Sequence, residues 1–410
     1  METELDKSAD GANSLRVELP LTQMVGSVES HITVVQELLN IKKLRQLSIE
    51  LTSSCNLACV YCHFAPLSRR GNDAEIKLVE EIIEFAESFP IDIVTMSGDA
   101  EVTLYEGWTK VARQLLKAGV KLRTISNFSK GIFTDEEVET LSRFSEILIS
   151  LDTPRPEILK KIRYRADLRT ITLNMQRVRA SAIEQGLEIP NFICNVVLHD
   201  KNVMDINRMT AFAIANGFAI INMVRFVDLE EVPGGKNDLR DNPNALRVYP
   251  ISTIDKLTAA KGVNSLMRAL ETAEGRINLS VGEDILEELN QVLEVDQAPK
   301  SDDVSQDLTG KAKRTKLCLM PWDYLSTFWN GDVPPCCIVK GTFVDNALQT
   351  KLIDVVNGAE LKDWRRTLLT GDLKSECVSC TYRPDTDTVT LEGIVREHLS
   401  EYGTISKSTQ

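Results

Sequence analysis

The sequence lacks features that would assign several common classes of protein. It has no run of 18 or more apolar residues, so no segment is long enough to span a membrane as an apolar helix. It also has no excess of basic charge, because 47 Lys and Arg are outnumbered by 60 Asp and Glu, which gives a net charge of -13. Such a charge repels phosphate backbones and anionic lipid, which argues against nucleic acid and membrane surfaces as partners.

The composition has no extremes. Hydrophobic residues make up 43% and charged residues 26% of the 410 positions, which excludes collagen-like, coiled-coil and wholly disordered chains. We find no internal repeat or low-complexity tract. The length suits one large α/β core with appendages, or two domains.

The N-terminus lacks the basic and apolar blocks of a signal peptide, since its first residues, METELD, are acidic. Residues 1–25 are polar and aperiodic and are expected to form a flexible leader. We therefore expect a cytoplasmic protein in a reducing environment. There, closely spaced cysteines indicate metal ligands or redox groups rather than disulfides, and the chain has nine of them.

Strand and helix patterns alternate from about residue 45. Short apolar runs with the length of buried strands start near residues 47, 91, 121, 146, 191 and 218. Helical periodicity separates them, for example over 75–88 and 108–118, and Thr134 with Glu137 forms a capping box before a helix that runs to about Ser142. Six βα units predict an α/β fold, a partial (β/α)6 barrel over 45–228 whose ligands bind at the carboxyl ends of the strands.

The pattern changes after this core. Residues 229–315 are expected to form barrel-flanking helices and linker, with a loop over 230–245 and a linker over 296–314. Residues 316–385 hold five of the nine cysteines and predict a small domain organised by a metal centre. Residues 386–410 are expected to form a C-terminal tail.

The first cysteine cluster follows the first predicted strand. Cys55, Cys59 and Cys62 form a Cys-x3-Cys-x2-Cys pattern within eight residues. Three thiolates this close can hold three corners of a 4Fe-4S cluster and leave its fourth iron open to another ligand. A zinc site is the alternative, but zinc sites usually pair two separate halves, and the only nearby histidine, His63, abuts the last cysteine.

This loop, on the first strand of a βα repeat, resembles that of the radical S-adenosylmethionine (radical SAM) superfamily. The aromatic Tyr61 before the third cysteine also matches the family. The resemblance covers residues 45–228. It implies that S-adenosylmethionine (SAM) chelates the open iron through its amino and carboxylate groups. It also implies that SAM is cleaved to a 5′-deoxyadenosyl radical, which abstracts hydrogen from the substrate.

Further positions resemble SAM-binding positions of the family. Glu101 lies in a segment similar to the family's Gly-Gly-Glu-Pro, although Ala100 replaces the second glycine and Val102 the proline, and it is expected to accept from the SAM amino group. Ser126, Asn127, Ser150 and Asp152 are expected to contact the ribose or carboxylate, or else to cap helices and turns. Arg163 is expected to bind the SAM carboxylate or to be an exposed helical arginine. The predicted interior polar group of the fifth strand is Asn195.

A second cluster of cysteines lies near the C-terminus. Cys318 and Cys336 form a Cys-x12-Gly-x4-Cys pattern that, with the downstream pair Cys377 and Cys380, resembles the SPASM/twitch extension of radical SAM enzymes. Four such thiolates would complete an auxiliary 4Fe-4S cluster, which suits electron transfer, and a four-thiolate zinc site is the alternative. Cys337 is expected to be a spare buried thiol, although a swap with Cys336 stays open.

The resemblance leaves the reaction open. Twitch-type relatives oxidise sugar or aminocyclitol alcohols, epimerise substrates or modify ribosomal peptides. Cys194 and Cys337 are candidate hydrogen donors for an epimerase, and a core thiol is the alternative for Cys194. We expect dehydrogenation or epimerisation of a small polar metabolite, with a flavodoxin or ferredoxin as electron donor. Peptide modification is the second possibility, and a non-catalytic cluster-carrying scaffold is the third.

Overall fold

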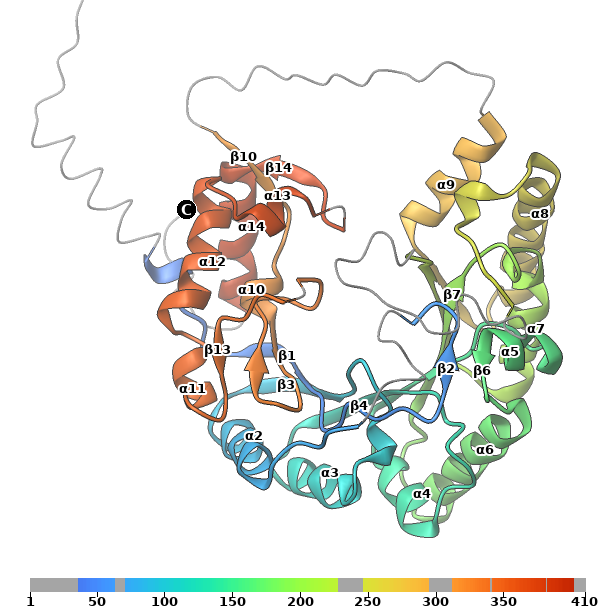
Figure 1. The fold of residues 1–410 in the computed structure, drawn as a ribbon, viewed down its shortest axis with the longest axis horizontal. Helices are drawn as coiled ribbons and strands as arrows, with labels where there is room; N and C mark the ends of the chain where they lie inside the picture. The colour runs from blue at the N-terminus through green and yellow to red at the C-terminus, as the bar shows by residue number, and fades with distance from the viewer. Residues whose placement is uncertain are drawn as a thin grey trace, which may run out of the picture.

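The computed structural model describes residues 36–62, 71–227, 246–294, 312–339, 341–380 and 382–401. Its centre is a curved sheet of eight strands, all parallel, in the order β11-β1-β3-β4-β5-β7-β8-β9. The strands span Leu44–Ile49 (β1), Ile91–Met96 (β3), Lys121–Ser126 (β4), Glu146–Ser150 (β5), Asn191–Leu198 (β7), Ile220–Arg225 (β8), Asn278–Val281 (β9) and Tyr324–Thr327 (β11). Figure 1 shows this sheet as an open arc with helices on its outer side.

Helices connect the strands and cover the outer face. They span Ile76–Ser88 (α2), Trp108–Lys117 (α3), Asp135–Leu141 (α4), Pro156–Ile162 (α5), Leu168–Glu184 (α6), Ile206–Asn216 (α7), Lys256–Ala273 (α8) and Glu283–Glu294 (α9). The predicted capping box is present, because Thr134 accepts from the Glu137 backbone while the Glu137 side chain accepts from the Thr134 backbone. A reciprocal pair of this kind satisfies two N–H groups that a helix start otherwise leaves unbonded.

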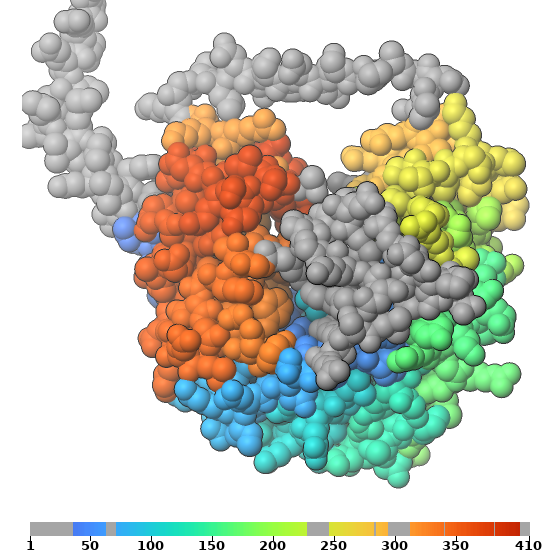
Figure 2. Space-filling model, viewed as in Figure 1, coloured from blue at the N-terminus to red at the C-terminus, as the bar shows by residue number. Residues whose placement is uncertain are grey.

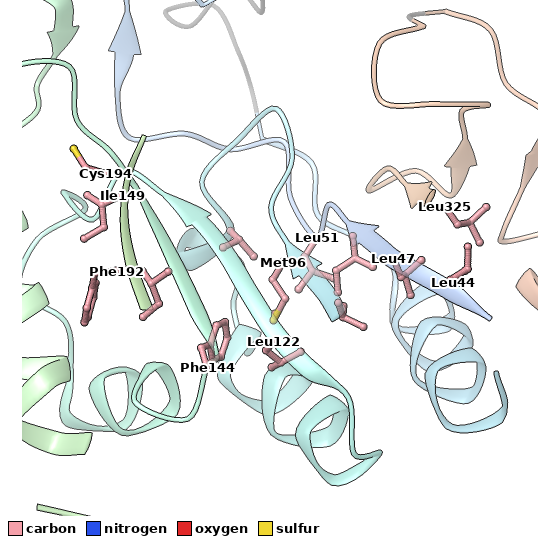
Figure 3. Packing of buried hydrophobic residues seen from close by; sticks show 14 of the residues in the cluster. Leu44, Leu47, Leu51, Met96, Leu122, Phe144, Ile149, Phe192, Cys194 and Leu325 are labelled. Carbon is pink, nitrogen blue, oxygen red and sulfur yellow. The ribbon is translucent and has the colours of Figure 1, made fainter. Parts of the chain in front are cut away.

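The core lies between the sheet and these helices. Side chains alternate along each strand, so one set faces the helices and the next faces the concave side. Figure 3 shows Leu47, Leu122, Phe192 and Cys194 among the buried apolar residues of this layer. The amphipathic α3 adds Trp108 and other buried residues from its inner face.

The C-terminal part packs against the start of the barrel. Its elements are α10 (Met320–Asp323), α11 (Leu352–Val355), α12 (Ala359–Thr370), α13 (Ser375–Val378) and α14 (Thr388–Glu401), with the two-stranded pairs β10 (Arg314–Lys316) with β14 (Asp385–Asp387) and β12 (Asp332–Val333) with β13 (Asp345–Asn346). Figure 2 shows these orange and red residues directly against the blue N-terminal elements. The indole of Trp322 donates to the Leu38 carbonyl at 2.7 Å across this contact.

The predicted α/β partial barrel is confirmed, and the structure adds two strands to the six expected. One is β9, from the segment expected to hold only helices and linker, and the other is β11, from the C-terminal part. The ladder ends at β11 on one side and at β9 on the other. The predicted leader and the loop over 230–245 lie outside the described residues, as does most of the linker. The domain boundaries stay predictions. No helix in the described ranges is long and apolar enough to cross a membrane.

Candidate functional site

The loop that carries the first cysteines is anchored to the segment after the fourth predicted strand. Its short strand β2 (Ala58–Cys59) pairs antiparallel with β6 (Arg163–Tyr164), so Cys59 lies opposite Arg163. The backbone N–H of Val60 donates to the Ile162 carbonyl at 2.9 Å in the same ladder. The three thiols of the loop are all partly buried: Cys55, Cys59 and Cys62.

A buried ionic network lies beneath Cys59. The Arg163 guanidinium donates to both carboxylate oxygens of Asp152, with Nε–Oδ2 at 2.9 Å and Nη2–Oδ1 at 3.0 Å. The Tyr61 hydroxyl donates to Asp152 Oδ2 at 2.6 Å, and the guanidinium lies 5.4 Å from the centre of the Tyr61 ring. The third nitrogen, Arg163 Nη1, lies 3.9 Å from Cys59 Sγ. Arg163 is buried in β6, so the alternative of an exposed helical arginine is wrong.

The network compensates the charges it buries. Burial lowers the pKa of Arg163, but the neighbouring charges of Asp152, Tyr61 and Cys59 raise it more, so the pKa lies well above its usual value. Burial raises the pKa of the Cys59 thiol to about 12, and the Arg163 charge acts in the opposite direction. A cluster ligand must be a thiolate. Arg163 therefore supplies the positive charge that a thiolate at Cys59 needs.

Glu101 joins the ends of the second and third predicted strands. Its Oε1 accepts from the Ser126 hydroxyl at 2.7 Å and the Thr103 hydroxyl at 2.7 Å, and its Oε2 accepts from the Asn127 backbone N–H at 2.8 Å. Glu101 as a whole is only 1% exposed, so these protein donors surround its carboxylate. The predicted contact of Glu101 with the SAM amino group stays a prediction.

A row of polar residues crosses the concave face. The register pairs Ser150 with Asn195, Asn195 with Asn222 and Asn222 with Ser280, so all four project from the same side of the sheet. The Asn222 amide donates to Asn195 Oδ1 at 2.8 Å. The row offers hydroxyl and amide groups without a formal charge. Asn222 and Ser280 were not predicted, because their role depends on a register that only the folded sheet defines.

Glu50, directly after β1, is a second unpredicted residue. It is buried, and its Oε2 accepts from the Asp99 backbone N–H at 2.6 Å. A Cβ atom at position 98 would lie 2.2 Å from this oxygen, so Gly98 is required for the close approach. The glycine in the predicted SAM-binding segment is therefore explained by a contact with Glu50.

His199, directly after β7, is a third residue that the sequence did not predict for this site. It is fully buried, and its ring centre lies 6.4 Å from that of Tyr61. Its Nδ1 accepts from the Lys201 backbone N–H at 3.1 Å, which places the proton of the neutral ring on Nε2. Within the described ranges, Nε2 has no hydrogen-bond partner. Burial lowers the pKa of His199 to about 4, so the ring is neutral at pH 7.

The second set of cysteines converges within the C-terminal part. Burial raises the pKa of Cys377 to about 12, and the charges of Cys318, Cys336 and Cys380 add to this effect. Cys318, Cys336 and Cys380 therefore lie close enough to Cys377 for their charges to act on it. The thiols therefore form one group although the chain separates them widely.

Cys337 differs from its neighbour. It is exposed while Cys336 is partly buried, so the expectation of a buried thiol at Cys337 is wrong. The charge of Cys336 acts on both Cys318 and Cys377. This geometry favours Cys336 as the ligand, and the hydrogen-donor role of Cys337 stays a prediction.

Cys194 lies on the opposite face of β7 from the polar row. Its Sγ is 3.8 Å from Met209 Sδ on α7 and 3.7 Å from the Leu151 carbonyl oxygen. It is fully buried among core residues (Figure 3). The position favours the alternative of a core thiol, and the hydrogen-donor role stays a prediction.

The donor sets fit iron-sulfur clusters. No group of three or more His, Cys, Asp or Glu among the described residues is arranged to hold a single metal ion. In a 4Fe-4S cluster each thiolate binds a different iron, so the sulfurs need not converge on one point. One set offers three thiols in a loop, and the other offers four from separate segments.

Comparisons with known proteins agree with these two sets. The model of the radical SAM superfamily matches residues 49–213, and that of SPASM, an iron-sulfur cluster-binding domain, matches residues 318–381. A probable GTP 3′,8-cyclase of Methanocaldococcus jannaschii is 27% identical over 198 residues, which are 46% of this chain and 61% of that protein. A GTP 3′,8-cyclase of Synechocystis sp. is 26% identical over 40% of this chain and 50% of its own length. The chain thus spans little more than half the length of these relatives.

Solved structures share the fold. Streptococcus suis SuiB bound to S-adenosylmethionine has a TM-score of 0.58 at 16% identity, covering 90% of this chain and 78% of SuiB. SuiB bound to the precursor peptide SuiA has a TM-score of 0.57 at 16% identity, covering 92% of this chain and 78% of SuiB. Native anSMEcpe with bound AdoMet has a TM-score of 0.51 at 13% identity, with 82% and 87% covered.

Proposed function

This chain belongs to the radical SAM superfamily and carries a SPASM domain, and from that premise we propose that it oxidises a polar substrate by hydrogen abstraction. The two domains use SAM and two 4Fe-4S clusters. When bound, these groups supply the 5′-deoxyadenosyl radical and an acceptor for a second electron. Cys55, Cys59 and Cys62 would hold the catalytic cluster, and Cys318, Cys336, Cys377 and Cys380 the auxiliary one.

The chain's own residues have three tasks in this reaction. Arg163, held by Asp152 and Tyr61, provides positive charge beside Cys59 and fixes the β2–β6 ladder under the loop. Glu101 holds the ends of β3 and β4 together at the place where SAM is expected to bind. Tight positioning of this kind is needed because a radical must form within reach of one hydrogen atom.

The placement of the remaining thiols favours dehydrogenation over epimerisation. An epimerase must return a hydrogen atom to the substrate radical, and a protein thiol usually donates it. Cys194 lies on the helix-facing side of β7, and Cys337 belongs to the C-terminal part. A dehydrogenase needs no such donor, because after hydrogen abstraction the substrate radical has only to lose a proton and one electron. A cluster held by Cys318, Cys336, Cys377 and Cys380 could accept that electron.

The polar row supports a neutral hydrogen-bonding substrate. Asn195, Asn222 and Ser280 present amide and hydroxyl groups on the concave face, which suit the hydroxyl groups of a sugar or aminocyclitol. We propose such a small metabolite as the substrate and a flavodoxin or ferredoxin as the electron donor. The reducing cytoplasm is the proposed setting, since both clusters depend on thiolates.

Peptide modification is the second candidate. It is supported by SuiB bound to the precursor peptide SuiA, which shares this fold over 92% of the chain. Peptide backbones also offer neutral donors and acceptors to an amide row. The product distinguishes the two candidates, because oxidation of a peptide changes the mass of a polypeptide, whereas oxidation of a sugar does not.

The test is anaerobic reconstitution followed by iron analysis and a SAM-cleavage assay. We expect about eight irons per chain and formation of 5′-deoxyadenosine that is lost in the triple variant of Cys55, Cys59 and Cys62. A value of about four irons that is unaffected by loss of Cys377 and Cys380 would contradict the auxiliary cluster. Two full clusters without SAM cleavage would instead indicate the scaffold role.

The same assay separates dehydrogenation from epimerisation. We expect Cys194→Ala and Cys337→Ala to keep both 5′-deoxyadenosine formation and substrate turnover. If either variant still cleaves SAM but loses turnover, that thiol is a hydrogen donor and the dehydrogenase proposal is wrong.

A further inference from the structure

A cavity of about 540 Å³ lies beside the second set of cysteines. Its lining includes Leu317 and Leu319, which flank Cys318 in the chain, and Arg45 in β1. Arg383 lines the same cavity. The cavity therefore joins a cluster ligand's immediate neighbours to a guanidinium from a distant segment.

Arg383 is held at this place by strand pairing. Lys316 pairs with Asp385 at the end of the antiparallel β10–β14 ladder, and the Leu317 backbone N–H continues it by donating to the Pro384 carbonyl at 2.9 Å. Cys318 follows Leu317 and Arg383 precedes Pro384, so this last hydrogen bond places Arg383 beside Cys318.

Among the described residues, Arg383 has no acidic partner. Across the ranges that the structure describes, it makes no hydrogen bond or ion pair, and its Nε is buried without a partner. Nearby cations are paired: Lys316 Nζ lies 3.0 Å from Asp385, and Arg45 lies 3.9 Å from Asp323 with a side chain that is 64% exposed. A buried N–H of a charged guanidinium is costly to leave without a partner, so a negative group is expected to reach it.

We propose that Arg383 is the charge partner of the auxiliary cluster and raises its reduction potential through Cys318. A 4Fe-4S cluster with four thiolates carries net negative charge and gains one more on reduction, so a nearby cation stabilises the reduced form more. The geometry supplies the contact: Arg383 lies opposite Cys318 where the β10–β14 ladder is continued by the Leu317–Pro384 hydrogen bond. The inference rests on the proposed function, because it requires the auxiliary cluster to be present.

The consequence concerns the second half of the oxidation. An auxiliary cluster that is easier to reduce is a better acceptor for the electron of a substrate radical. Arg383 is therefore a tuning residue, which acts on the reaction only through the cluster.

The experiment is an anaerobic dithionite titration of the reconstituted full-length protein, followed by electron paramagnetic resonance. In Arg383→Gln the equilibrium constant for reducing the auxiliary cluster is expected to fall roughly tenfold, which is about 59 mV for a one-electron couple. The catalytic cluster in the same sample is the internal reference and should keep its potential. Arg383→Lys, which retains the charge, should restore most of the shift.

Arg45→Gln is the matched control, because it removes an exposed cation from the same cavity. Its auxiliary potential should stay near that of the wild type. An unchanged potential in Arg383→Gln, or an equal fall in Arg45→Gln, would overturn the assignment while both clusters are loaded. Iron and sulfide content distinguishes these results from failure of the proposed function, which would leave every variant, and the wild type, with a single cluster.

Discussion

Replacing Arg365 with methionine tests how the C-terminal part is fastened to the barrel. Arg365 lies on α12, is fully buried and has no carboxylate among its hydrogen-bond partners in the described chain. Its guanidinium donates to the carbonyls of Pro321 at 2.9 Å, Leu39 at 2.6 Å and Val356 at 2.8 Å, and to Asn357 Oδ1 at 3.2 Å. One side chain therefore satisfies four oxygens from three segments.

The magnitude follows from two opposing effects. Burial lowers the pKa of Arg365 from 12.5 to about 9, which corresponds to a cost of about 5 kcal/mol for keeping the charged form inside. A hydrogen bond from a charged donor contributes roughly 2 kcal/mol, so four contribute about 8 kcal/mol. Arg365→Met keeps the apolar stem but removes every donor and leaves four buried oxygens without a partner, so the free energy of unfolding should fall by at least about 3 kcal/mol.

The assay is equilibrium urea unfolding followed by circular dichroism. The midpoint in urea should move down while the slope stays constant, which identifies a change in stability rather than in the denatured state. Arg366→Met is the control, because the neighbouring Arg366 is 45% exposed and forms a surface ion pair with Asp363 at 3.1 Å. It should change stability by less than about 0.5 kcal/mol. Equal midpoints for the two variants would refute the reasoning.

Three further predictions concern the two cysteine sites. Burial lowers the pKa of His199 from 6.5 to about 4, so as the pH drops the unfolded chain binds a proton at this position before the folded chain does. About 3 kcal/mol of the free energy of unfolding should therefore be lost between pH 6.5 and 4. Urea unfolding of His199→Gln over this pH range should show most of that loss removed. Asp152→Asn leaves the Arg163 guanidinium buried without its carboxylate and should lower the unfolding free energy by about 3–5 kcal/mol; an unchanged urea midpoint would contradict the network. Iron analysis should give about four irons per chain for Cys336→Ala and about eight for Cys337→Ala, and the reverse order would show that the ligand is Cys337.

Much of the fold follows from local patterns. The six predicted strands are short runs rich in β-branched residues, and the helices between them have clear apolar faces, so periodicity alone places them. The strand β11, with the sequence YLST, has no such signal. It becomes a strand because β1 pairs with it, and β1 lies far away in the chain.

The site divides in the same way. Cysteine spacing can be recognised in the sequence, so both sets of thiols could be predicted from it. The partners of Arg163 and the exposure of Cys337 depend on tertiary contacts that spacing does not encode. Glu50 and His199 were missed because a single acidic residue or histidine after a strand is most often exposed to solvent, and their burial becomes visible only in the folded barrel.

The pairing of β11 with β1 also has a consequence for how the protein is made. On a ribosome, β1 emerges early, and its outer edge stays open until residues 324–327 have been synthesised. An open edge beside a hydrophobic strand invites pairing with other chains, and contacts between distant segments slow folding. We expect the nascent barrel to be aggregation-prone for most of its translation, and C-terminal truncations that remove β11 to accumulate as insoluble protein.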